Sequence, residues 1–121
     1  MTPWTASDAW ILASINGLRR GVSLSRLIRS ADACNHAIPT RDGLARGLGS
    51  LMAAGLVETA EHGFRLTKAG KAVRAEWTGG MFTWADSLMP ELEKLERIDV
   101  EYPLTQAEVD EAYEAYSGRP R

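Results

Sequence analysis

The stretch from Asn35 to Val57, NHAIPTRDGLARGLGSLMAAGLV, decides the fold. Pro39 disfavours helical backbone at the residue before it, and the Thr40 side chain is placed to cap the free amides of a new helix. Apolar residues then follow at helical spacing: Leu44, Leu48, Leu51 and Met52. Such a stripe must face a core, and Gly55 suits the left-handed position that ends a helix. The stretch predicts a turn, a capped helix and the start of a strand.

Two further helices are predicted upstream. Thr5 and Asp8 form a capping box ahead of an apolar run, and Ser23 can cap a second helix that ends near Cys34. Between the two helices, the residues GVS predict a short extended connector. The chain therefore enters the deciding stretch from a helix.

Downstream, the segments LVETA and FRL flank the turn EHG and predict a small β-hairpin. Thr67 can cap a helix that runs to about Trp77. Beyond the break at TGG, Ser87 is predicted to cap another helix, and Thr105 with Glu108 forms a capping box for a last one.

The order of helix, short strand, helix, turn, helix, hairpin and helix resembles the winged helix-turn-helix. The runs AAGLV and GFRLTKAGKAV are similar to the "L…AGL(V/I)…LT..G" run of bacterial winged-helix regulators of the multiple-antibiotic-resistance and phenolic-acid-decarboxylase types. The resemblance implies a mainly α fold with a small β-hairpin over residues 1–77, and a DNA-binding regulator. The resemblance covers Trp10 to Trp77 and does not extend to the tail from Met81 onward; residues 78–121 are predicted to form an acidic helical extension.

Charge divides the chain in the same way. Between residues 19 and 74 there are ten Lys and Arg against four acids, a net charge of +6, whereas residues 76–121 carry eleven acids and four bases, a net charge of −7. A basic block with an acidic tail indicates contact with a polyanion in one half of the chain. The alternative is that solvated faces have merely segregated by sign.

The third helix stands in the position from which winged helices read DNA. On its outward face Arg46 can reach a base edge, and Ser50 can add a less selective hydrogen bond. Further residues are predicted to contact phosphates of double-stranded DNA: Thr40, Arg41, Arg26, Arg29, Arg65 and Lys68. The helix also contains three glycines, however, and the spacings Gly43/Gly47 and Gly49/Ala53 form a flat strip that suits a partner helix. A protein–protein interaction module without DNA binding is therefore the alternative.

The extension is predicted to be a dimerisation arm, because its apolar stripes need partners that a small domain does not supply alone. The stripes consist of Leu88, Leu92 and Leu95, and of Val109, Tyr113 and Tyr116. The expected partner is a second copy of the chain. Two alternatives are that the extension folds back and masks the basic face, or that it is a loosely held solvated segment.

Catalytic and metal chemistry have little support. Cys34, His36 and His62 do not have the spacing of a zinc site, and no phosphate loop or dinucleotide fingerprint is present. We therefore expect no enzyme activity, no metal and no cofactor. There is no apolar run of membrane-spanning length and no secretory signal, and a lone cysteine suits a reducing compartment. The expectation is a cytoplasmic, non-enzymatic protein with no membrane contact.

Overall fold

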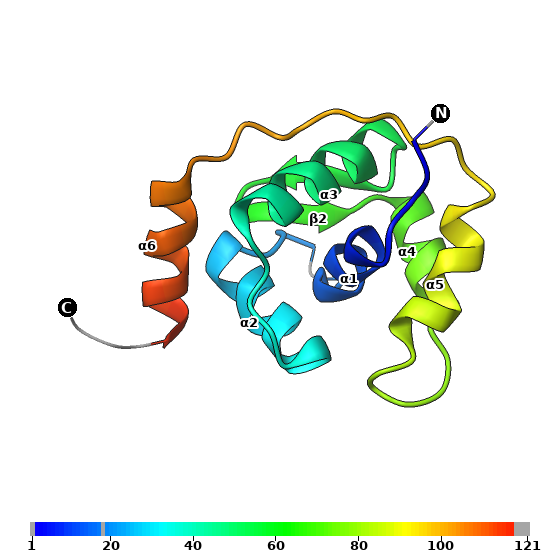
Figure 1. Ribbon diagram of the computed structural model, residues 1–121, viewed down its shortest axis with the longest axis horizontal. Helices are drawn as coiled ribbons and strands as arrows, with labels where there is room; N and C mark the ends of the chain where they lie inside the picture. The colour runs from blue at the N-terminus through cyan, green and yellow to red at the C-terminus, as the bar shows by residue number, and fades with distance from the viewer. Residues whose placement is uncertain (1, 18, 118–121) are drawn as a thin grey trace.

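The computed structural model describes residues 2–17 and 19–117. Its elements follow one another along the chain as α1 (Ala6–Ser14), α2 (Leu24–Asn35), α3 (Arg41–Ala53), β1 (Val57–Ala60), β2 (Gly63–Leu66), α4 (Lys68–Arg74), α5 (Trp84–Leu92) and α6 (Gln106–Ser117). Figure 1 shows α3 and β2 crossing above α1 and α2, with α4 and α5 on one side of α1 and α6 on the other side, beside α2.

The predicted caps set where the helices begin. Thr5 and Asp8 exchange both bonds of a capping box at the start of α1. The Thr40 hydroxyl accepts a hydrogen bond from the Gly43 amide at 3.0 Å, and the Ser23 hydroxyl accepts one from the Arg26 amide at 3.2 Å. Each bond satisfies an amide that the helix itself leaves free.

The sheet includes one residue of the connector between α1 and α2. β1 and β2 pair antiparallel with Val57 opposite Leu66, and Val22 forms a bridge with Phe64 on the other side of β2. The amide of His62, in the hairpin turn, also donates to the Arg20 carbonyl at 3.0 Å. The connector is thereby fixed along the hairpin, as expected for the first strand of a winged helix.

The turn after α3 joins the hairpin and α4. Gly55 has a φ of +78°, the left-handed conformation predicted for it. Its carbonyl accepts a 2.6 Å hydrogen bond from the Thr67 hydroxyl, which also caps α4 by accepting from the Gly70 amide at 3.0 Å. A side chain at Gly70 would collide with the Leu56 carbonyl, so the glycine allows α4 to pack against this turn. The fold is a winged helix-turn-helix with a C-terminal helical extension.

The extension packs against the winged domain and shares its core. α5 lies against α1 and α4, and α6 lies against α2. Leu88 and Leu92 are fully buried and Val109 is nearly so, within the same apolar cluster as Ile11 and Leu48. The hydrophobic core is therefore continuous across residue 77.

This packing corrects part of the predicted dimer interface. Leu88, Leu92 and Val109 are covered by their own chain, so none of the three is available to a second copy. Tyr116 is half buried, and its hydroxyl donates a 2.6 Å hydrogen bond to Asp32 of α2. Leu95 and Tyr113 do stay on the surface, and they are 37% and 36% exposed.

The start of α5 also differs from its prediction. The helix begins at Trp84, three residues ahead of Ser87, so Ser87 lies inside the helix and is not its cap. The Ser87 hydroxyl instead donates to the Thr78 carbonyl and accepts from the Thr78 amide, each at 3.1 Å. Trp84 explains the earlier start, because it is buried and its indole donates to the Cys34 carbonyl at 3.1 Å.

Between α5 and α6 the chain crosses the outer side of α3. Residues 98–103, here called the strap, run in extended form from Arg97 to Leu104. The Tyr102 amide donates to the Ala45 carbonyl of α3 at 2.9 Å. Figure 1 shows this segment passing along α3 before the chain turns into α6.

Candidate nucleic-acid interface

The helix in the recognition position is enclosed on most sides. Within α3, all of which the structure describes, Asp42, Arg46 and Ala53 are the exposed residues. At a step of about 100° per residue, these three fall within a sector of about 40°. Arg46 is the one long donor side chain in that sector. α3 therefore offers a narrow strip to a partner, with a single group that can reach a base edge.

Ser50 does not belong to that strip, which corrects its predicted role. The residue is completely buried, and its hydroxyl has no hydrogen-bond partner within the described part of the chain. On the helical wheel it lies toward α1 and not toward solvent. Ser50 therefore cannot hydrogen-bond to a base from this conformation.

The smooth face of α3 is already in contact with the chain itself. A side chain at Gly47 would approach Ile11 of α1 to 3.0 Å, so this glycine serves the packing of two core helices. A side chain at Gly49 would collide with the Val100 carbonyl and lie 2.7 Å from the Tyr102 amide nitrogen. The glycine strip that suggested a partner helix thus accommodates α1 on one side and the strap on the other.

Arg41, predicted to bind phosphate, is held by neighbouring groups. Its guanidinium pairs with Asp42 and with Glu101 of the strap at 3.2 Å, and it donates to the Leu104 carbonyl at 2.9 Å. The hydrogen bonds that Arg41 donates to Asp42 and, less strongly, to Glu101 raise the pKa of Arg41 above its ordinary value. The side chain is charged, but its donors are used by Asp42, by Glu101 of the strap and by the Leu104 carbonyl.

The other predicted phosphate ligands are more open. Arg26, Arg29 and Lys68 are exposed, and Thr40 is exposed although its hydroxyl caps α3. Arg65 is half buried and pairs with Glu58 across the hairpin at 2.7 Å. These residues do not form one cluster, because Arg29 lies where α2 faces α6, close enough for its charge to act on the Tyr116 hydroxyl.

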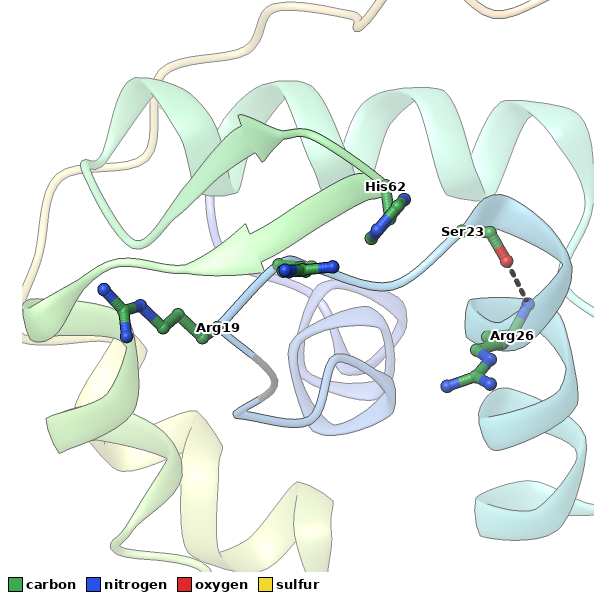
Figure 2. A pocket seen from close by; sticks show the side chains of 6 residues that line it. Arg19, Ser23, Arg26 and His62 are labelled. Carbon is green, nitrogen blue, oxygen red and sulfur yellow. Dashed lines mark hydrogen bonds between the residues drawn. The ribbon is translucent and has the colours of Figure 1, made fainter.

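A basic surface gathers instead around the connector and the hairpin. Three adjoining hollows share Arg19 in their lining. The first, of about 560 Å³, lies between the connector, the hairpin turn and the start of α2. In Figure 2, Ser23, Arg26 and His62 border it on one side, and Arg19 extends on the other. The second and third hollows continue over the hairpin to α4, with volumes of about 410 and 250 Å³.

We call this surface the basic track. Its members are Arg19, Arg20, Arg26, His62, Arg65, Lys68 and Lys71. Glu58 and Glu61 also line it, and Glu58 is engaged by Arg65. Among the residues that the structure describes, no carboxylate forms an ion pair with Arg19, Arg20 or Arg26. The track thus presents several cations that remain available to an anionic partner.

Four members of the track were absent from the predicted contacts. Arg19, Arg20 and Lys71 contributed only to the net charge predicted for residues 19–74, and His62 was considered only as a metal ligand. The sequence did not show that the connector and the hairpin lie side by side. The bridge between Val22 and Phe64 places the connector beside the hairpin, and a single bridging residue leaves no periodic signal in the sequence.

Cys34 and His36 are packed against neighbouring residues of the fold. Burial raises the pKa of the Cys34 thiol above its ordinary value, although Arg74 opposes the shift. His36 has a φ of +51° at the end of α2, and its ring lies 5.2 Å from that of Phe82. Over residues 2–17 and 19–117, His, Cys, Asp and Glu side chains do not assemble in threes to hold a metal ion. Within the same residues, no helix combines the length and apolar character needed to cross a bilayer.

No protein-family model, curated protein or solved structure matches this chain.

Proposed function

We propose that this protein binds double-stranded DNA, mainly through phosphate contacts along the basic track, and acts as a regulator of transcription. The supporting observation is the row of cations that follows three adjoining hollows from α2 across the hairpin to α4, in which Arg19, Arg20 and Arg26 form no ion pair within the described part of the chain. Polyanion affinity rises with the number of phosphates that a protein neutralises. Arg19, Arg20, Arg26 and Lys68 supply the principal charges.

Sequence selectivity in this proposal is low. Arg46 is the exposed donor of α3 that can reach a base edge, and one bidentate contact contributes about 1–3 kcal/mol of discrimination. Phosphate contacts fix the position of the protein on the duplex but carry no base information. DNA affinity should therefore depend strongly on salt and weakly on sequence.

The competing proposal, a protein-interaction module, rested on the smooth face of α3. That face contacts α1 through Gly47 and the strap through Gly49, so its glycines are accounted for within the chain. A homodimer remains compatible with the proposal, with Leu95 and Tyr113 as the predicted interface residues that stay on the surface.

The test is a salt series of affinities for a mixed-sequence duplex. Arg20→Ala and Arg26→Ala should each reduce the magnitude of the log–log slope by about 1, since each removes one phosphate contact. Lys94→Ala is the matched control, because Lys94 is an exposed cation of the extension that pairs with Glu91, away from the track. Absence of binding even at low salt would refute the proposal. If Lys94→Ala reduces the salt slope as much as the two track variants do, the track is not the DNA-binding surface.

A further inference from the structure

The strap is fixed at both ends by buried residues. Arg97 is 7% exposed, and its Nε donates to Asp8 of α1 at 2.9 Å while its Nη1 reaches Asp99 at 3.3 Å. The same guanidinium lies over the Trp4 ring, 5.8 Å from its centroid. Leu104, at the other end, belongs to the apolar core. Both ends of the strap are therefore anchored in buried parts of the fold.

Between these anchors the strap is lightly held. Tyr102 is half buried and its ring meets Phe64 edge-on at 5.2 Å, whereas the other strap residues are exposed. Ile98 and Val100 each leave nearly half of their surface in solvent. Among the residues described, one backbone hydrogen bond joins the strap to α3, from the Tyr102 amide to the Ala45 carbonyl. Segments with few buried contacts and exposed backbone open at low free energy, so the middle of the strap can lift while its ends stay in place.

Like a nucleic-acid backbone, the strap presents negatively charged groups that can accept hydrogen bonds from Arg41. Glu101 presents a carboxylate to Arg41, and the Leu104 carbonyl takes a second donor of the same guanidinium. Asp99 and Glu101 add negative charge along the flank of α3, where an approaching phosphate would be repelled. The docked strap thus uses Arg41 and disfavours a second anion.

We propose that the strap is a cis-acting competitor of DNA for α3. While it is docked, DNA has only the basic track and Arg46; when it lifts, Arg41 is released from Glu101 and can bind a phosphate. This inference rests on the proposed DNA binding. It makes the strap an autoinhibitory contact that weakens affinity without abolishing it.

Gly49 offers a way to lift the strap without changing charge. In Gly49→Ala the new methyl group collides with the Val100 carbonyl, so the strap must move away from α3. Gly80→Ala is the matched control, because a side chain there meets no atom within 4 Å among the described residues. We expect roughly fivefold tighter duplex binding for Gly49→Ala, about the effect of one added charge-assisted contact, and no change for Gly80→Ala.

A second pair of variants protects the test against a folding defect in Gly49→Ala. Glu101→Gln removes the strap carboxylate that pairs with Arg41 and leaves the pair of Arg41 with Asp42 in place, and Glu93→Gln removes an exposed charge just after α5. Glu101→Gln should raise affinity more than Glu93→Gln and should increase the salt slope by about 1, because Arg41 gains a phosphate. Hydrogen exchange at the Tyr102 amide should be faster in Gly49→Ala than in wild type. This measurement detects lifting of the strap without DNA.

The outcomes separate the two proposals. If wild type binds duplex DNA but Gly49→Ala and Glu101→Gln bind no more tightly than their controls, the strap is not a competitor and DNA binding stands. If none of the five proteins binds DNA at low salt, the proposed function fails and this inference fails with it. Accelerated Tyr102 exchange in Gly49→Ala together with unchanged affinity would also overturn the competitor role.

Discussion

α3 and the basic track both belong to the basic block of residues 19–74. Most of α3 is covered by other segments, whereas the track is open to solvent. α3 has the recognition position of a winged helix, yet α1, the core and the strap leave it a strip of Asp42, Arg46 and Ala53. The track runs over a connector and a hairpin, where cations project into open hollows. The difference teaches that the position of a helix in a fold does not determine how much of it a partner can reach.

The contrast follows from what the two regions bury. α3 has leucines toward the core and glycines toward two other segments, so most of its surface is used for packing. The connector and hairpin bury Val22 and Phe64 and leave their long basic side chains in water. Substitutions of the core-facing leucines of α3 should therefore act on stability, and substitutions in the track on binding. The following predictions test that division.

The largest effect is expected where the enclosure of α3 is anchored. Arg97→Ala leaves the buried Asp8 carboxylate without its ion-pair partner and should lower the free energy of unfolding by about 3–5 kcal/mol. Urea denaturation measures this. Lys94→Ala, on the exposed surface nearby, should change stability by no more than about 0.5 kcal/mol. Equal losses in the two variants would show that the anchor is not held as described.

A crossed pair tests the division most directly. Leu48→Ala, in α3, should cost about 2–5 kcal/mol of stability because it opens a cavity in the core. Arg20→Ala, in the track, should change stability by no more than about 0.5 kcal/mol. Duplex affinity of the folded proteins should show the reverse order, with Arg20→Ala the weaker binder. Comparable losses of affinity in both variants would break the comparison.

Alkaline pH should loosen α6, which supports the far end of the strap. The hydrogen bond to Asp32, aided by burial, raises the pKa of Tyr116 above its ordinary 10.0. This contribution to stability is therefore complete below pH 10.0 and is lost as the pH rises through the folded-state pKa.

Tyr116→Phe isolates that contribution from the other tyrosines. Wild type should lose more stability than Tyr116→Phe between about pH 9 and about pH 11. Thermal unfolding monitored at both pH values measures the difference. Parallel losses would mean that the bond between Tyr116 and Asp32 contributes nothing to the packing of α6.

The smallest effect is expected at Ser50. Removing its buried hydroxyl in Ser50→Ala should leave stability unchanged or raise it by up to about 1 kcal/mol, because that hydroxyl has no partner in the described residues. Base preference should also be unchanged, whereas Arg46→Ala should relax it. Binding-site selection on random duplexes distinguishes the two variants. Altered preference in Ser50→Ala would return α3 to the role of a broad reading surface.

Local chemistry explains which structural predictions were confirmed. Thr40, Thr67 and the box of Thr105 with Glu108 cap their helices, because a cap depends on residues within one turn. Contacts distant in sequence were not predictable in this way. Nothing near Gly49 indicates that residue 100 lies on it, and nothing near Leu88 indicates that α1 covers it.

The same reasoning applies to the binding site. Arg26, Arg65 and Lys68 could be proposed from their charge and their elements, but Arg19 and Arg20 needed the bridge that places the connector beside the hairpin. Ser50 was misplaced because a helical wheel divides a helix into one buried and one exposed face. On α3 the exposed face is narrowed from both sides, because α1 covers the side that carries Gly47 and Ser50 and the strap covers the side that carries Gly49.

The buried pair of Asp8 and Arg97 has a consequence for how the chain folds. These residues are 89 positions apart, and the hydrogen bond from Trp4 to Leu95 spans 91. Contacts so distant in sequence close large loops and slow folding. During synthesis the first helix emerges long before its partner arginine, so α1 completes its surroundings only when most of the chain has left the ribosome. The winged domain therefore reaches its final form late, together with the extension that encloses it.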